Sequence, residues 1–460
     1  MGTYTQQNND YLGKDSIGKL LFKLSLPAIL AQIINLLYNL VDRVYIGHMP
    51  GDGALALTGV GICMPIIMIV SAFAALISNG GAPRASMAMG EGDNDTAEKI
   101  LGNSFIVQII ISVILTTVLL LFNRPMLMAF GASDNTIGYA TSYMNIYAVG
   151  TIFVQLTLGM NAFITAQGFA KTGMLSVLIG AVCNIILDPI FIYGFHMGVR
   201  GAATATILSQ AVSTVWVLAF LTGNKTILRI KKKHLKLDSK IVIPGLALGL
   251  APFIMQASES VITVCFNSSL LKYGGDIAVG TMTILTSIMQ FIMLPMQGLG
   301  QGSQPIISYN YGAKNAERVK KAFKLLMMVD LIYSMAMWAI VMIFPQIFVR
   351  IFSSNTELIA FAKNALRIYI ASMGVFGAQM ACQMTFLSIG NAKASITVAV
   401  MRKFILLVPL IYIMPNIVPN PTTGVYMAEP IADACSVAFT VVLFYFQFRK
   451  AMKKINNSGK

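Results

Sequence analysis

Charged side chains are scarce in this chain of 460 residues. Only 11% of the residues are Asp, Glu, Lys or Arg, whereas 56% are apolar and the mean hydropathy is +0.72. A soluble domain carries roughly 25% charged residues, which it needs to cover a surface that faces water. The composition therefore excludes an ordinary soluble protein and predicts an integral membrane protein.

Residues that build metal centres and catalytic sites are also rare. All five cysteines fall inside apolar segments, at spacings that suit neither a zinc site nor a disulfide framework. His48, His196 and His234 lie in connecting segments and predict no ligand cluster. The stretch 13–20 approaches a phosphate-binding loop but lacks its final Ser or Thr and a preceding strand. We therefore expect no enzyme activity and no cofactor.

Long apolar segments recur along the whole chain. A bilayer helix needs about 20 mostly apolar residues, and these segments are continuous rather than alternating, which favours helices over barrel strands. The sequence predicts an all-α fold with twelve transmembrane helices, at about 20–47, 55–80, 99–122, 137–163, 171–193, 201–222, 241–267, 277–299, 322–344, 358–388, 394–414 and 426–448.

The net charge of +15 is explained by how the basic residues are distributed between the two sides of the membrane. If the N-terminus is cytoplasmic, 24 of the 33 basic residues lie in segments on the inner side. This is the bias of Lys and Arg toward cytoplasmic loops that orients membrane proteins. It predicts a multi-pass protein of the cell membrane with both termini in the cytoplasm, surrounded by lipids and with no nucleic-acid partner.

The sequence indicates an internal repeat with two copies. The strongly basic segment 223–240 separates an N-lobe, 1–222, from a C-lobe, 241–460. The segments 80–83 and 302–305 both end in proline and are interpreted as loops that end a helix. Pro83 and Pro305 are 222 residues apart, and Gly168 and Gly390 keep the same offset. The repeat predicts two six-helix lobes related by a pseudo-two-fold axis along the membrane normal, in a monomer.

Polar residues form a stripe on the first apolar segment. Asn35, Tyr38, Asn39 and Asp42 are spaced so that they share one helical face. Such a face on an apolar helix must line a cavity or contact partner helices, and Asn35 and Asn39 are assigned to a substrate cavity. Pro27 removes a backbone hydrogen bond and is interpreted as a hinge.

The fifth segment carries a second acidic position. Asn184 and Asp188 are four residues apart on one face, and Pro189 follows. Asp42 and Asp188 both fall in the outer half of their spans, where they could face each other. Two neighbouring carboxyl groups in surroundings of low dielectric constant titrate together, so they can hold a proton or bind a hard cation. Alternatively, Asp188 caps a helix that begins at Pro189, and Asp42 is solvated at the membrane edge.

The second half contains fewer candidates. Gln256 belongs to a polar stripe with Ser260, Thr263 and Asn267, beside Glu259, and Gln256 and Glu259 are assigned to the substrate cavity. Asp330 has no polar neighbours in the sequence and is placed near the cytoplasmic side. Arg402 and Lys403 are expected to reach that membrane surface with their charged ends.

At these residues the chain resembles the multidrug and toxic compound extrusion (MATE) family. The resemblance rests on Pro27 with Val41-Asp42-Arg43-Val44-Tyr45-Ile46-Gly47, on the paired Gly/Pro segments, and on Asn184…Asp188-Pro189, which looks like the DinF-type branch. It implies a cation site in the N-lobe. The matching positions are Tyr38, Asp42, Asn184, Asp188 and Thr206, with Asp42, Asn184, Asp188 and Thr206 as Na⁺ ligands.

The resemblance also implies a function, which is export of cationic amphiphilic compounds by alternating access in exchange for H⁺ or Na⁺. Another bacterial branch has an acidic residue on the tenth span, where this chain has only Glu357 at the outer end. The coupling site is therefore expected in the N-lobe. Two alternatives remain open, a flippase for lipid-linked precursors of the same superfamily and a passive channel.

Overall fold

The computed structural model describes residues 11–49, 51, 53–352 and 356–457, and the remaining parts of the two predicted lobes lie outside it. In the described residues all regular structure is helical. The helices are α1 (Tyr11–Lys14), α2 (Ile17–Gly47), α3 (Gly53–Gly90), α4 (Asn94–Ala129), α5 (Ile137–Val149), α6 (Thr151–Ala166), α7 (Ala170–Pro189), η1 (Ile190–Gly194), α8 (Val199–Thr222), η2 (Lys232–His234), α9 (Ser239–Gly312), α10 (Ala316–Ile343), α11 (Pro345–Arg350), α12 (Thr356–Tyr369), α13 (Met373–Ser388), α14 (Ala392–Val400), η3 (Met401–Leu407), α15 (Val408–Ile417) and α16 (Pro421–Asn457).

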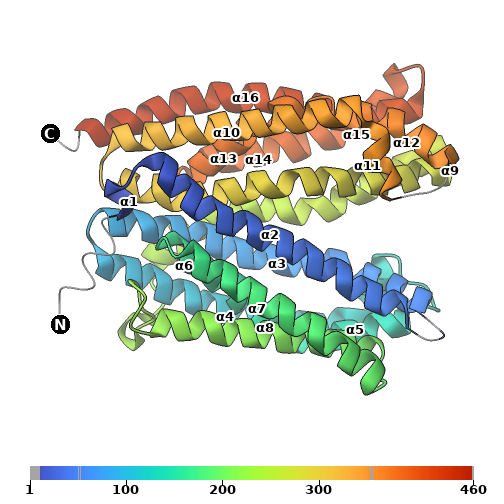
Figure 1. Cartoon of the computed structure of the whole chain (residues 1–460), viewed down its shortest axis with the longest axis horizontal. Helices are drawn as coiled ribbons and strands as arrows, with labels where there is room; N and C mark the ends of the chain where they lie inside the picture. The colour runs from blue at the N-terminus through green and yellow to red at the C-terminus, as the bar shows by residue number, and fades with distance from the viewer. Residues whose placement is uncertain (1–10, 50, 52, 353–355, 458–460) are drawn as a thin grey trace.

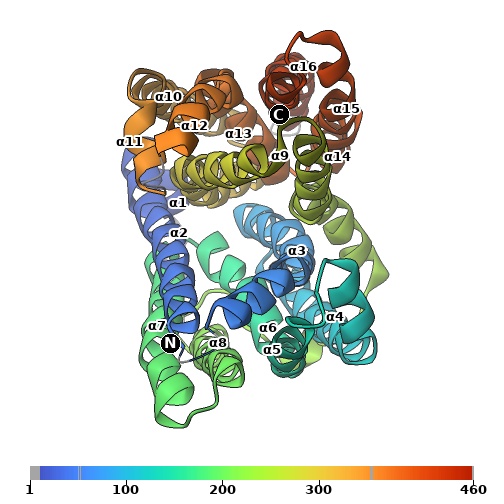
Figure 2. The ribbon, with the colours of Figure 1, turned by 90° about the vertical axis from the view of Figure 1, so that its right-hand side faces the viewer.

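The helices form two bundles that lie side by side. Seen end-on, α3–α8 occupy one half of the molecule and α10–α16 the other, with α2 and α9 at the junction (Figure 2). Helix α1 and the C-terminal end of α16 lie at the same end of the long axis (Figure 1). We call this the linker end, because residues 223–240 join α8 to α9 there. The predicted all-α fold with two lobes is confirmed.

The helices are long and apolar enough to cross a membrane. Among the described residues nine helices pass this test, and two bent pairs, α5 with α6 and α12 with α13, pass as one span each. One of the nine is the 74-residue helix α9, which contains two spans. The prediction of twelve spans is therefore confirmed.

Four of the predicted spans differ in shape from the expectation. The fourth span bends by 56° between α5 and α6, and the tenth bends by 49° between α12 and α13. The seventh and eighth spans join almost without a loop, because the chain reverses at Gly275, where φ is +63° and ψ is −162°. Glycine adopts this left-handed backbone without the steric cost that other residues have.

The two Gly/Pro segments do not end helices, so that interpretation was wrong. Helix α3 continues through Pro83 to Gly90, and α9 continues through Pro305 to Gly312. Proline interrupts an isolated helix because it lacks an N–H group. Membrane helices tolerate it where neighbouring helices and local adjustments satisfy the freed backbone groups. The repeat itself is present, but both copies lie inside spans.

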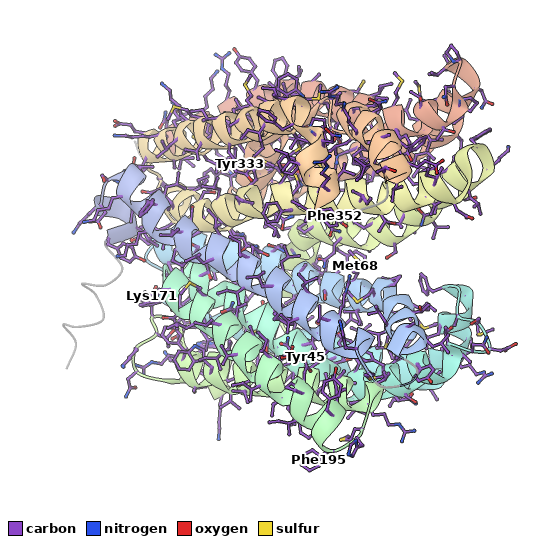
Figure 3. All side chains as sticks on the ribbon, turned by 45° about the vertical axis from the view of Figure 1, so that its right-hand side comes forward. Tyr45, Met68, Lys171, Phe195, Tyr333 and Phe352 are labelled. Atoms are coloured by element: carbon purple, nitrogen blue, oxygen red, sulfur yellow. The ribbon has the colours of Figure 1, made fainter. Side chains whose placement is uncertain are left out.

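Large apolar side chains cover the outside of the bundle. Phe195, at the edge of the N-lobe in Figure 3, is 66% exposed, and Leu121 on α4 is 70% exposed. A soluble monomer rarely exposes apolar surface over whole helices, so this surface is suited to contact with lipid. The polar side chains of the candidate site lie between the helices instead.

The lobes meet at the linker end through a symmetric backbone contact. A Cβ atom on Gly90 would lie 2.0 Å from the carbonyl oxygen of Tyr309, and one on Gly312 would lie 2.0 Å from that of Met87. Gly90 and Gly312 are 222 positions apart, and so are Met87 and Tyr309. The sequence repeat therefore recurs as a two-fold contact in space, which places the axis between α3 and the second half of α9.

This contact predicts the effect of adding one methyl group. Gly312→Ala forces the new Cβ against a backbone carbonyl that cannot rotate away, so we expect it to destabilise the protein by about 1–3 kcal/mol. The measurement is the thermal melting of the detergent-purified protein. Gly280→Ala is the control, because no described residue lies within 4 Å of a Cβ there. Equal melting temperatures for the two variants would contradict the contact.

Candidate functional site

The carboxyl groups of Asp42 and Asp188 meet between α2 and α7. Asp42 lies in the last turns of α2, and Asp188 is the penultimate residue of α7, so both lie far from the linker end. The two helices pack against each other, and the carboxyl groups are close enough for a direct hydrogen bond. The structure thus brings together two residues that are 146 positions apart in the sequence (188 − 42).

Three buried oxygen atoms between α2 and α7 have no hydrogen-bond donor among the described residues. Asn184 donates from Nδ2 to Oδ1 of Asp188 at 3.2 Å. The unsatisfied atoms are Oδ1 of Asn184, Oδ1 of Asp42 and Oδ2 of Asp188. Carboxylate and amide oxygens can accept but not donate. A proton between the carboxyl groups, or a hard cation, would satisfy them, which is the chemistry expected from the residue types.

Three tyrosines surround the carboxyl groups. Tyr38, one turn before Asp42 on α2, and Tyr143, on α5, both interact electrostatically with Asp42. Tyr147 stacks on Tyr143 with ring centroids 6.3 Å apart and interacts with Tyr38. Tyr143 and Tyr147 were missed in the sequence. Their spacing of four on the fourth span was the available signal, but it did not show that this face turns toward the first span.

Thr206 lies next to this group, and its hydrogen bonds go elsewhere. Its hydroxyl donates to the carbonyl of Ala202 at 3.0 Å and lies within hydrogen-bonding range of Tyr143. Thr206 was predicted as a Na⁺ ligand, but it is linked to the carboxyl groups through Tyr143. The role of each predicted site residue stays a prediction, while their proximity is a property of the fold.

The helix ends beside the site are held in place by irregular backbone. Helix α7 runs through Pro189 and changes into the π-helical turn η1. Asp188 is therefore the end of a helix and not the N-cap of the next one. Tyr193, in η1, donates from its hydroxyl to the carbonyl of Tyr45 at 2.7 Å and so ties this turn to α2. Turns of this kind occur often at functional sites.

The residues assigned to a substrate cavity do not form one connected group. Asn35 is exposed, and Asn39 donates from Nδ2 back to the carbonyl of Asn35 at 2.6 Å. Gln256 is half-buried on α9. In the described part of the chain no hydrogen bond joins the two α2 residues to Gln256 or Glu259. Helix α2 also runs unbroken through Pro27, whose role as a hinge stays a prediction.

The C-lobe contains a network of five charged residues that the sequence did not predict. Lys403 donates to Glu259 at 2.5 Å, and Arg402 binds Asp433 at 2.6 Å and Glu429 at 3.1 Å. The expectation that Arg402 and Lys403 reach the membrane surface is wrong. They are only 6% and 2% exposed, because acidic partners inside the lobe pair with them.

The backbone explains how two consecutive residues both point inward. Arg402 and Lys403 lie in the first turn of the π-helix η3, which widens the helix and changes the direction of successive side chains. Arg402 also lies over the ring of Phe376, 4.7 Å from its centroid. Glu429 and Asp433, which are spaced by four in the last apolar segment, were the missed signal for partners of these cations.

Asp330 lies in the middle of its span and not near the cytoplasmic side as expected. It is halfway along α10 and fully buried, and neither carboxyl oxygen has a hydrogen-bond donor in the described part of the chain. The equivalent residue of the N-lobe is Gln108, 222 positions earlier, whose amide donates to the carbonyl of Gln155 at 2.8 Å. An acid thus replaces an amide at equivalent positions of the two lobes.

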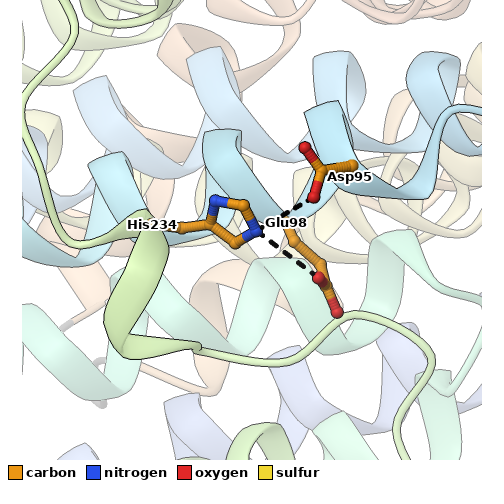
Figure 4. A group of neighbouring side chains, drawn as sticks. All are labelled: Asp95, Glu98 and His234. Carbon is orange, nitrogen blue, oxygen red and sulfur yellow. Dashed lines mark ion pairs between the residues drawn. The ribbon is translucent and has the colours of Figure 1, made fainter.

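One histidine and two acidic residues join the linker to α4, a group of possible metal ligands that the sequence did not predict. Asp95, Glu98 and His234 bring one ligand atom each within 4.8 Å of one another (Figure 4). However, Lys233 already pairs with Asp95 at 2.8 Å and Lys231 with Glu98 at 2.6 Å. These ammonium groups neutralise the carboxylates that a metal would need. The cluster therefore attaches segment 223–240 to α4 through ion pairs.

Known proteins share this sequence pattern over most of its length. The MatE family model matches residues 27–190 and 252–413. The multidrug export protein MepA of Staphylococcus haemolyticus (strain JCSC1435) is 24% identical over 95% of this chain and 95% of its own. MepA of Staphylococcus aureus (strain NCTC 8325 / PS 47) is 23% identical over 95% of this chain and 96% of its own.

Solved structures agree with these relatives. A MATE crystal structure in the bent conformation has a TM-score of 0.91 at 24% identity and covers 99% of this chain and 100% of its own. The MATE multidrug transporter DinF-BH, solved as a complex, has a TM-score of 0.86 at 36% identity and covers 94% of this chain and 96% of its own. The chain therefore belongs to the MATE family, and its resemblance to the DinF-type branch is confirmed.

The C-lobe network predicts a stability effect. Arg402→Met leaves Glu429 and Asp433 buried without their cation, and breaking a buried pair in this way costs about 3–5 kcal/mol. We expect a clearly lower melting temperature in detergent. The triple variant Arg402→Met/Glu429→Gln/Asp433→Asn removes the unpaired charges and should recover most of the loss. A single variant that melts like the wild type would show that the network does not support the fold.

Proposed function

We propose that this protein is a cation-coupled multidrug efflux antiporter that exports cationic amphiphilic compounds. The observation that carries the proposal is the meeting of Asp42 and Asp188, with three unsatisfied buried oxygens, between two spans of the N-lobe. Ionisable groups inside a membrane are costly and mark ion pathways. The family relationship supports transport, since MepA is named a multidrug export protein.

The site supports a simple exchange mechanism. Oxygens that lack donors attract an external H⁺ or Na⁺, and binding draws Tyr38 and Asn184 around the carboxyl groups. If the N-lobe shape that holds the ion disfavours the bound compound, the compound also disfavours the ion, because coupling between two ligands is reciprocal. Alternating exposure of the two sides then turns ion entry into export of the compound.

The substrate class rests on charge and on relatives. DinF-BH and a second MATE family relative of this chain are both named multidrug proteins. The acidic residues Asp42, Asp188 and Glu259 offer negative charge to a cationic compound, and the 29 methionines offer flexible apolar contacts. No residue of this chain is required to make or break a covalent bond in such a cycle.

The orientation follows from the basic residues. The linker end carries the basic segment 223–240 and α1 together with the end of α16, so we place this end in the cytoplasm of the cell membrane. Asp42 and Asp188 then lie toward the outer side. The protein acts as a monomer among membrane lipids in this proposal.

The coupling ion is tested by supplying one gradient at a time. Everted membrane vesicles are given a fluorescent cationic dye, first with a proton gradient alone and then with a Na⁺ gradient alone. An antiporter should accumulate the dye against its gradient under one of the two ions. Movement that never exceeds equilibration under either ion would identify a passive channel and overturn the proposal.

The site assignment is tested by removing one carboxylate at a time. Asp42→Asn and Asp188→Asn keep size and polarity but remove the charge that binds the ion. We expect each to slow dye efflux by about tenfold or more, within the usual range of coupling energies. Asp134→Asn, in an exposed loop, is the matched control. Wild-type efflux by both site variants would place the coupling ion elsewhere.

A further inference from the structure

Both lobes carry acidic residues on equivalent helices, but only the C-lobe pairs them with basic side chains. In the N-lobe, Asp42 and Asp188 lie on the first and fifth spans and form no ion pair in the described residues. In the C-lobe, Glu259 lies on the seventh span and Lys403 on the eleventh, while Glu429 lies on the twelfth. The first and fifth spans correspond to the seventh and eleventh through the repeat. The C-lobe thus carries buried cations on helices whose N-lobe counterparts hold Asp42 and Asp188 without an ion pair in the described residues.

The network has one more acid than base. Glu259, Glu429 and Asp433 contribute three negative charges when ionised, and Arg402 and Lys403 contribute two positive charges. The sum is a deficit of one positive charge. A single additional cation would therefore neutralise the network without any other change. A compound with one positive charge has the complementary charge.

Glu259 is the accessible member of the network. Its side chain is 45% exposed, whereas that of Lys403, which binds it, is 3% exposed. Glu259 therefore presents one side to the surroundings and the other to a buried ammonium group. A molecule that approaches from the accessible side meets a carboxylate whose charge is already compensated by Lys403.

A second acid, Glu429, lies against Arg402, the neighbour of Lys403 in the chain. Glu429 interacts electrostatically with both Lys403 and Arg402. Arg402 holds Asp433 at 2.6 Å and Glu429 at the longer distance of 3.1 Å. If Lys403 leaves Glu259, Glu429 is therefore the acid to which it would move, while Arg402 keeps Asp433. Every cation in the network would still have a carboxylate partner after this shift.

We propose that Glu259 and Lys403 form an exchangeable ion pair, in which a cationic substrate replaces the Lys403 ammonium on Glu259 and Lys403 moves to Glu429. Lys403 acts as a tethered cation that competes with the substrate. A neutral compound cannot take over the charge of Lys403, so the exchange selects for cations. This inference rests on the proposed function for its substrate class and names the residue that determines specificity.

The test compares a cation with a neutral compound of similar shape. The probes are tetraphenylphosphonium and triphenylphosphine oxide, and their binding to the full-length protein in lipid nanodiscs is measured by calorimetry. Lys403→Met removes the competitor, so tetraphenylphosphonium should bind about tenfold more tightly. Binding of the neutral probe should not change. Tighter binding of both probes would show a packing effect and overturn the exchange.

Two further variants keep the test decisive. Glu259→Gln should lower the affinity for tetraphenylphosphonium to that for the neutral probe, and Glu259→Gln/Lys403→Met should behave in the same way. A gain that persists in the double variant, or a Glu259→Gln protein that still prefers the cation, would overturn the proposal. If Lys403→Met does not fold, the Glu259→Gln result decides alone.

The outcome is separable from that of the proposed function. Binding is measured without any ion gradient, so the exchange can be present even if no ion drives efflux. Conversely, coupled efflux with unchanged cation affinity in Lys403→Met would retain the antiporter and reject the tethered cation.

Discussion

The cost of an unpaired charge inside the bilayer is the constraint on which the rest of the structure depends. Such a group must be paired, must bind an ion or must face water. The C-lobe pairs its acids with Arg402 and Lys403, which are covalently part of the chain. The N-lobe holds Asp42 and Asp188 together, and no cation of the described chain pairs with them. The C-lobe thus pairs these acids with basic side chains of its own, whereas the carboxyl pair of the N-lobe has no such partner in the described residues.

This difference is placed on a nearly symmetric scaffold. The two-fold contact of Gly90 and Gly312 at the linker end brings the backbones of α3 and α9 together. Contacts through backbone atoms and small residues let helices approach closely in lipid, where the hydrophobic effect does not drive them together.

Irregular helix segments serve the charged sites in both lobes. The π-turn η1 follows Asp188, and the π-helix η3 contains Arg402 and Lys403. In the N-lobe Tyr193 of η1 ties the turn to α2, and in the C-lobe the wider turn lets Arg402 and Lys403 both point inward. Without it, two consecutive basic residues could hardly both reach acids inside the lobe. Both deviations from regular helix therefore lie at or next to charged residues inside a lobe.

The sequence by itself determined the membrane class, the number of spans and the repeat, and it named Asp42 and Asp188 as candidates, because hydropathy, charge bias and residue spacing are local or periodic signals. Only the tertiary structure decided which helical faces meet. It brought Tyr143 and Tyr147 to the carboxyl groups, buried Arg402 and Lys403 against acids of distant spans, and gathered His234 with Asp95 and Glu98. The physical reason is that a partner from another helix leaves no trace in local spacing, so burial and pairing appear only when the helices pack.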